Sequence, residues 1–102
     1  MILEFLSNEN SQEANYRIVG KTPGFRSLIR RLEKIDGFEI VKTSHSFLSG
    51  DFSVMGSYQG LPVLIETPLS DIIISCDDRS ECGSSFLKIM SAWEPSLFER
   101  LF

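Results

Sequence analysis

The chain has 102 residues, of which 42% are apolar, 11% aromatic and 24% charged, and its formal net charge is −4. This length fits one domain, residues 1–102, with a single core, and the composition excludes a disordered chain. No apolar run approaches the roughly 20 residues needed to cross a bilayer, and residues 1–6 lack the features of a signal peptide. We therefore expect a cytoplasmic protein without a membrane role.

The N-terminal residues predict two short strands. An apolar run over residues 2–6 indicates the first strand, and the polar residues 7–13 indicate a break after it. Residues 16–19 predict the second strand, although residues 12–19 are also compatible with a helical turn.

A helix is predicted next. Thr22 is a suitable N-cap and Pro23 suits the first helical position, where no backbone donor is lost. The helix is expected to end near Ile35, with Gly37 in a left-handed cap conformation. Its apolar stripe, spaced at helical intervals, consists of Phe25, Leu28, Ile29 and Leu32.

The middle of the chain predicts a run of strands. Gln59 and Gly60 favour a tight hairpin, in which Gly60 supplies the positive φ of a G1 bulge, and Pro68 marks the exit from the returning strand. The β-branched segment Asp71–Cys76 is typical of a central strand covered on both faces. The expected strands are 38–43, 52–58, 61–66 and 71–76, with a turn over 44–50.

The C-terminal part predicts a second amphipathic helix and a short terminal one over 96–102. Asp78 and Glu81 are spaced as a capping box, and Ser84 or Ser85 is the alternative cap. We expect an α+β domain, in which a mainly antiparallel sheet of four to six strands packs against two helices. The stripe of the second helix is Phe86, Ile89, Met90 and Trp93, and the terminal helix carries Leu97, Phe98, Leu101 and Phe102.

Few residues of the sequence are candidates for catalysis. His45 is the only histidine, so an enzyme would have to combine it with Cys76, Cys82 or a serine, and its Ser-His-Ser context matches no catalytic signature. We assign no catalytic residue. The two cysteines are too few for a disulfide scaffold and do not form a CxxC pair, so we expect reduced thiols.

No cofactor or metal is expected either. Glycine-rich phosphate loops and nucleophile elbows are absent from the sequence. The segment from Cys76 to Cys82 gathers thiols and carboxylates, but it lacks the spacing of a zinc or calcium site. A solvated acidic loop explains the same residues, and a small-molecule ligand is not expected.

Charge is distributed unevenly along the chain. Residues 51–102 contain eight acidic and three basic residues, a balance that repels nucleic acid and attracts a basic partner. The basic residues Arg26, Arg30, Arg31 and Lys34 of the first helix are interpreted as a solvated face, and a nucleic-acid partner is not expected. The candidate partner-binding residues are Asp71, Asp77, Asp78 and Glu81.

The order of elements over residues 52–76 resembles that of small bacterial immunity proteins. The shared pattern is a strand, the turn Tyr58-Gln59-Gly60, a second strand, Thr67-Pro68 and a short strand from Asp71. The resemblance is to immunity proteins paired with contact-dependent growth-inhibition toxins. It implies a cytosolic protein that binds and blocks the toxic nuclease domain of a delivered effector, without catalysis.

The charge of the acidic residues suggests how such a protein could bind a nuclease. Nuclease domains present basic clefts, and the four candidate carboxylates can imitate the phosphates that bind there. Two alternatives remain open: a small enzyme using His45 with a cysteine, and an oligomerising or adaptor module that uses an exposed edge strand.

Overall fold

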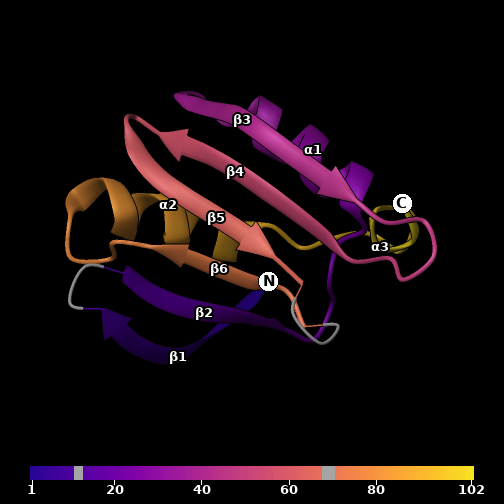
Figure 1. Cartoon of the computed structure of the whole chain (residues 1–102), viewed down its shortest axis with the longest axis horizontal. Coiled ribbons are helices and arrows are strands. Elements are labelled where there is room, and N and C mark those ends of the chain that lie inside the picture. The colour runs from indigo at the N-terminus through magenta and orange to yellow at the C-terminus, as the bar shows by residue number, and fades with distance from the viewer. Residues whose placement is uncertain (11–12, 68–70) are drawn as a thin grey trace.

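The structure is a computed structural model that describes residues 1–10, 13–67 and 71–102. It contains a six-stranded antiparallel sheet in the order β1-β2-β6-β5-β4-β3 (Figure 1). This arrangement confirms the expected α+β class. The elements are β1 (Ile2–Asn10), β2 (Glu13–Val19), α1 (Phe25–Lys34), β3 (Phe38–His45), β4 (Phe52–Tyr58), β5 (Leu61–Glu66), β6 (Ile73–Cys76), α2 (Glu81–Ala92) and α3 (Leu97–Leu101).

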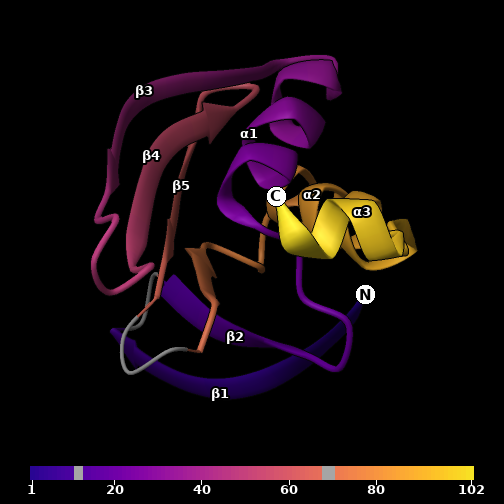
Figure 2. The ribbon, with the colours of Figure 1, turned by 90° about the vertical axis from the view of Figure 1, so that its right-hand side faces the viewer.

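The core lies between the sheet and the helices, which all occupy one face of it. Figure 2 shows the sheet curving around the three helices. Val54, Ile65 and Ile74 are aligned across β4, β5 and β6, and each is fully buried. The helices contribute buried side chains from the predicted stripes, namely Leu28, Leu32, Phe86 and Met90.

Strand β6 is central, as predicted, because it pairs with β2 on one side and β5 on the other. The expectation that it is covered on both faces holds in part: the helices cover the face that contains Ile74 and Cys76 (Figure 2), and Ser75 is buried on the other face. On the other face Ile73 is half-buried and lies beside its pairing partners Arg17 and Glu66. Side chains on neighbouring strands therefore cover part of the face that the helices leave open.

The N-terminal hairpin is longer than predicted. Strand β1 continues to Asn10 and β2 begins at Glu13, so the expected polar break over 7–13 and the helical turn over 12–19 are wrong where the structure describes them. Residues 11 and 12 lie outside the described residues. The pairing of the two strands reaches Asn10 and Glu13, because main-chain hydrogen bonds form regardless of side-chain polarity.

The start of α1 differs from the prediction. The helix begins at Phe25, and its N-cap is Gly24, without a side-chain cap from Thr22. The N–H groups of Arg26 and Ser27 instead donate to the main-chain oxygen of Phe102. A Cβ on Gly24 would lie 2.3 Å from the carbonyl carbon of Phe102, so this close approach requires glycine. Gly37 has the predicted left-handed conformation, with a φ of 86°, but it lies in the turn after the helix, whose C-cap is Ile35.

The β4–β5 hairpin is present, but its turn is of another type. Gln59 and Gly60 have φ values of 50° and 86°, and Tyr58 pairs directly with Leu61. These features describe a two-residue type I′ turn without the predicted G1 bulge. Strand β3 also extends two residues beyond the predicted end, to His45. The strand exit predicted at Pro68 lies outside the described residues.

The C-terminal helices are capped by serines. The Ser80 side chain accepts a hydrogen bond from the N–H of Gly83 and caps α2, so the predicted caps at Asp78, Ser84 and Ser85 are wrong. Ser96 and Glu99 form a capping box at α3. The predicted stripe of α2 is buried or half-buried, whereas the apolar residues of α3 are exposed: Leu97, Phe98, Leu101 and Phe102.

Candidate protein-binding site at the acidic end of the sheet

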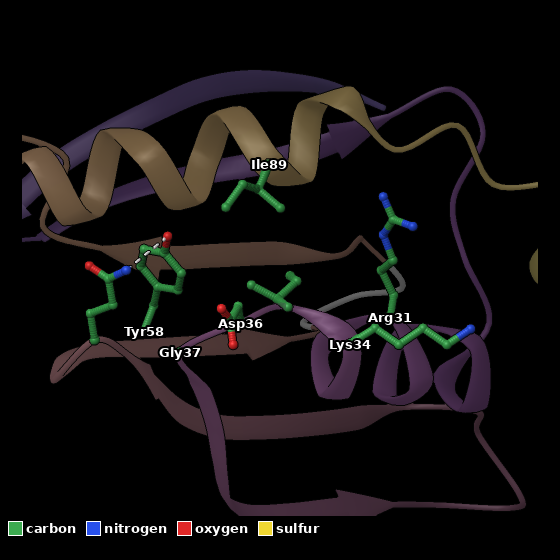
Figure 3. Close-up of a pocket in the computed structure, with 8 residues that line it drawn as sticks. Arg31, Lys34, Asp36, Gly37, Tyr58 and Ile89 are labelled. Carbon is green, nitrogen blue, oxygen red and sulfur yellow. Dashed lines mark hydrogen bonds between the residues drawn. The ribbon is translucent and has the colours of Figure 1, made fainter.

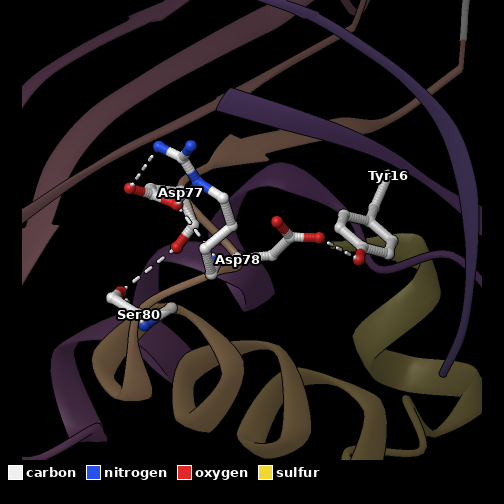
Figure 4. A network of polar contacts seen from close by, with 6 residues as sticks. Tyr16, Asp77, Asp78 and Ser80 are labelled. Atoms are coloured by element: carbon white, nitrogen blue, oxygen red, sulfur yellow. Dashed lines mark hydrogen bonds and ion pairs between the residues drawn. The ribbon is translucent and has the colours of Figure 1, made fainter. Parts of the chain in front are cut away.

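Three of the four predicted acidic residues gather at the turn between β6 and α2. Asp77 and Asp78 directly follow β6, and Glu81 is the first residue of α2. We call Asp77, Asp78 and Glu81 the acidic turn. Figure 4 shows that Asp77 and Asp78 point in opposite directions, while Ser80 lies at the start of the helix. Strand alternation explains this divergence, because successive side chains leave a strand on opposite faces.

Asp77 is held by Arg79. A carboxylate oxygen of Asp77 accepts hydrogen bonds from the main-chain N–H of Arg79, at 3.0 Å, and from its Nε, at 3.1 Å. The side-chain and main-chain hydrogen bonds from Arg79 lower the pKa of the Asp77 carboxyl. Asp77 is therefore ionised and oriented, although its charge is partly balanced by Arg79.

Asp78 is held by a residue of a different strand. The hydroxyl of Tyr16, on β2, donates a 2.7 Å hydrogen bond to a carboxylate oxygen of Asp78 (Figure 4). Burial and the contact with Asp78 raise the pKa of Tyr16 to about 12. Burial, with the nearby charges of Asp78 and Asp77, raises the pKa of the Cys76 thiol to about 11. The two neighbours of Asp78 therefore stay neutral at physiological pH.

Two hollows flank the acidic turn. One, of about 290 Å³, is lined by Glu13, Leu61, Pro62, Asp77 and Arg79. The other, of about 300 Å³, lies between the N-terminal hairpin and α2, and its lining includes Leu3, Tyr16, Asp78 and Leu87. Each hollow combines a carboxylate with apolar side chains. Such a surface offers a partner both electrostatic attraction and apolar contact.

The fourth predicted residue, Asp71, lies apart from the other three. It precedes β6, whereas Asp77 follows it, and six residues of extended chain span roughly 20 Å. Asp71 forms an ion pair of 3.6 Å with Arg17, which also contacts Glu4. The structure thus brings together three of the predicted acids and leaves Asp71 at the opposite end of the strand.

Comparison with family models, curated proteins and solved structures finds no match to this chain. Its function is therefore inferred from the geometry of its own residues.

His45 is not placed to activate either cysteine. Its ring stacks on Phe25 with 4.6 Å between ring centroids and also contacts Phe47. It pairs with Phe52 at one end of β4, whereas the thiol of Cys82 contacts Gln59 beyond the other end. Cys76 lies on β6, which β4 and β5 separate from the strand of His45. Since a general base must reach its nucleophile within hydrogen-bond distance, the enzyme alternative has no assembled dyad in this structure.

Metal sites and membrane-spanning helices were also considered in the residues that the structure describes. Within residues 1–10, 13–67 and 71–102, no three histidine, cysteine or acidic side chains gather as metal ligands. None of the helices in those ranges has the length and apolar content needed to cross a membrane.

Strands β1 and β3 are the two edges of the sheet. In β3, the extra residue Val41 interrupts the pairing between Ile40 and Lys42, a bulge of the kind that discourages pairing with another chain. This geometry gives no specific support to oligomerisation through β3.

Sequence reasoning missed the residues that position the acidic turn. Tyr16 and Arg17 belong to the predicted second strand, but their contacts with Asp78 and Asp71 depend on the pairing of β2 with β6. More than half of the chain lies between these two strands. The alternation of side chains within each strand does not show which residue of β2 pairs with which residue of β6. The signal that was available is the alternation of β2, which places Tyr16 on the same face as the buried Ile18.

Proposed function

We propose that this protein binds a basic partner domain through the acidic turn and thereby blocks the activity of that partner, without catalysis of its own. The partner class that agrees with the resemblance of residues 52–76 is the nuclease domain of a growth-inhibition toxin, met in the cytosol. The observation that carries the proposal is that Asp77 and Asp78 are each held by a neighbouring side chain beside two partly apolar hollows.

Orientation of the carboxylates supports this role. Arg79 holds Asp77, and Tyr16 holds Asp78, so these side chains lose little conformational freedom when a partner binds. Preorganised groups bind more tightly because less entropy is lost on association. Negative charge at this end would accelerate encounter with a basic cleft, while contacts in the hollows would slow dissociation.

The experiment begins with the product of the gene adjacent to that of this protein. The tagged product is used as bait for the purified full chain, and its nuclease activity is measured with and without the chain. We expect capture together with loss of nuclease activity. Failure of the chain to bind the bait and to inhibit it would overturn the proposal.

A matched pair of variants then tests the position of the interface. Glu81→Lys and Asp71→Lys make the same change in net charge at exposed positions on opposite ends of β6. We expect Glu81→Lys to reduce the association rate constant by about tenfold at low salt, and Asp71→Lys by less than about twofold. Equal effects of the two variants would show that only net charge matters and would remove the acidic turn as the binding site.

A further inference from the structure

A second site-like feature lies between the helices and the β4–β5 turn, and none of the acidic-turn residues lines it. A cleft of about 700 Å³ opens between the C-terminal end of α1, α2 and the β4–β5 turn (Figure 3). Arg31 and Lys34 line one end of it, and Tyr58 lies toward the other. The sequence predicted a solvated basic face on α1, whereas the structure places two of its cations at a cavity.

Neither Arg31 nor Lys34 forms an ion pair in the described part of the chain. Arg31 does act on the carboxyl of Glu99, whose pKa is lowered by hydrogen bonding with Ser96 and also by the charge of Arg31. The Arg31 guanidinium also lies 5.5 Å from the ring centroid of the buried Trp93, which limits its motion. Residues three apart on a helix share a face, but Figure 3 shows Lys34 extending along α1 while Arg31 points toward α2, so one anionic group reaches both cations only with another rotamer of Lys34.

The other end of the cleft offers a neutral hydrogen-bond donor. Tyr58 is only 6% exposed, and its hydroxyl accepts a 3.4 Å hydrogen bond from the side-chain amide of Gln59. No described residue accepts the proton of this hydroxyl. A buried hydroxyl generally donates as well as accepts, and since this one lines an open cleft, its proton is available to water or to an oxygen atom of a bound ligand.

The space between the two ends has apolar side chains beside one acidic residue. Ile35, directly after α1, and Ile89 of α2 line it, and Figure 3 shows Ile89 directed from α2 toward the cleft. Asp36 is the acidic residue of the lining. Its charge would repel a second anionic group placed near the middle of the cleft.

We propose that this cleft binds a small organic anion with one charged end. A phosphate or carboxylate group lies against Arg31 and Lys34, an apolar body covers Ile35 and Ile89, and an uncharged oxygen at the far end accepts the proton of Tyr58. This assignment departs from the sequence expectation of no small-molecule ligand. It is independent of the proposed protein partner, since it uses none of the acidic-turn residues.

The test uses the full chain and three probes, titrated by isothermal calorimetry and by amide chemical shifts. The probes are phenyl phosphate, inorganic phosphate and phenol, and phenylacetate replaces phenyl phosphate in a second arm that distinguishes phosphate from carboxylate ligands. We expect phenyl phosphate or phenylacetate to bind at least about tenfold more tightly than inorganic phosphate or phenol, because only they occupy both the charged and the apolar parts. Binding of neither aromatic anion at millimolar concentration would overturn the proposal.

Four variants locate the anion. Arg31→Gln and Lys34→Gln should each weaken binding by about tenfold, while Arg30→Gln, a matched loss of charge outside the cleft, should change it by less than about twofold. Asp36→Asn should strengthen binding, because it removes the repelling charge. Lys34 is exposed, so its variant keeps the test valid if Arg31→Gln perturbs the packing of Trp93. Equal affinities for Arg30→Gln and Lys34→Gln would place the anion elsewhere.

A further probe tests the role of Tyr58. In 4-acetylphenyl phosphate, a ketone oxygen lies at the opposite end from the phosphate. We expect it to bind about fivefold more tightly than phenyl phosphate to the unmodified chain and with equal affinity to Tyr58→Phe, because one neutral hydrogen bond contributes about this factor. The same preference in both proteins would remove Tyr58 from the site.

Discussion

The hydroxyl of Tyr16 donates a 2.7 Å hydrogen bond to Asp78, which joins the N-terminal hairpin to the turn that starts α2. The contact connects residues 62 positions apart. It orients one carboxylate of the acidic turn and keeps the phenol protonated, since burial and Asp78 raise the pKa of Tyr16 to about 12.

Replacing Tyr16 by Phe tests the energetic value of this bond. We expect Tyr16→Phe to lower the free energy of unfolding by about 1–2 kcal/mol at pH 7, because a partly buried hydrogen bond to a charged group is lost. Urea denaturation followed by circular dichroism measures the change. An unchanged unfolding midpoint would contradict the expectation.

The same substitution tests the pH dependence of stability. The unfolded chain releases the Tyr16 proton near the ordinary pKa of 10.0, whereas the folded chain keeps it until about pH 12. Stability from this group is therefore complete below pH 10 and decreases as the pH rises from about 10 to 12. The free energy of unfolding should fall more steeply in this range for the unmodified chain than for Tyr16→Phe. Parallel pH profiles would show that Tyr16 titrates normally in the folded state.

The two cysteines should differ in reactivity. Cys76 is fully buried and its pKa is raised to about 11, mainly by burial, whereas Cys82 is half-buried. Because the thiolate is the reactive species, iodoacetamide at pH 8 should alkylate Cys82 first, and Cys76 only after unfolding. Peptide mass spectrometry identifies the labelled residue. Equal labelling rates in the folded protein would indicate that the end of β6 opens readily.

Gly83 should be intolerant of any side chain. A Cβ at this position would lie 1.7 Å from the carbonyl oxygen of Asp77, which no side-chain movement can relieve. We expect Gly83→Ala to lower the free energy of unfolding by about 3 kcal/mol, and the neighbouring Ser84→Ala by less than about 0.5 kcal/mol. Thermal denaturation of both variants makes the comparison. Similar melting temperatures would show that the turn and α2 can move apart.

The β4–β5 turn offers a stabilising substitution. Gln59 has a positive φ of 50°, which side chains other than Asn and Asp rarely adopt. Gln59→Asn should raise the free energy of unfolding by about 0.5 kcal/mol, whereas Gly60→Ala should lower it by about 1 kcal/mol. Urea denaturation measures both changes. A loss of stability in Gln59→Asn would mean that the contacts of Gln59 with Tyr58 and Cys82 outweigh its backbone strain.

Local signals in the sequence predicted the elements whose form depends on neighbouring residues. The stripe of α1 and the turn at Gln59 and Gly60 are examples, because helical spacing and positive φ depend on only a few consecutive residues. The start of α1 was predicted wrongly at Thr22, since the acceptor of its first N–H groups is Phe102, at the far end of the chain. A contact between residues so far apart in the sequence produces no local residue pattern from which it could be predicted.

The site residues show the same dependence on distance along the chain. The sequence predicted that Asp77, Asp78 and Glu81 lie together, because they are close along the chain. It misplaced Asp71 with them, since a strand of four residues separates Asp71 from the turn. The cleft was not predicted, because its lining residues come from the end of α1, from β4 and from α2, which are distant in the sequence.

The pairing of β2 with β6 joins two parts of the sheet that are each built from consecutive strands. Among the described residues, β3, β4, β5 and β6 pair with their neighbours along the chain, as do β1 and β2, so the pairing of β2 with β6 is the one strand pairing between non-consecutive elements of the sheet. We expect the N-terminal hairpin to detach as one unit before global unfolding, with its amide hydrogens exchanging together and sooner than those of β4 and β5. The acidic turn would then lose Tyr16 in the same opening, which couples partner binding to protection of the hairpin from exchange.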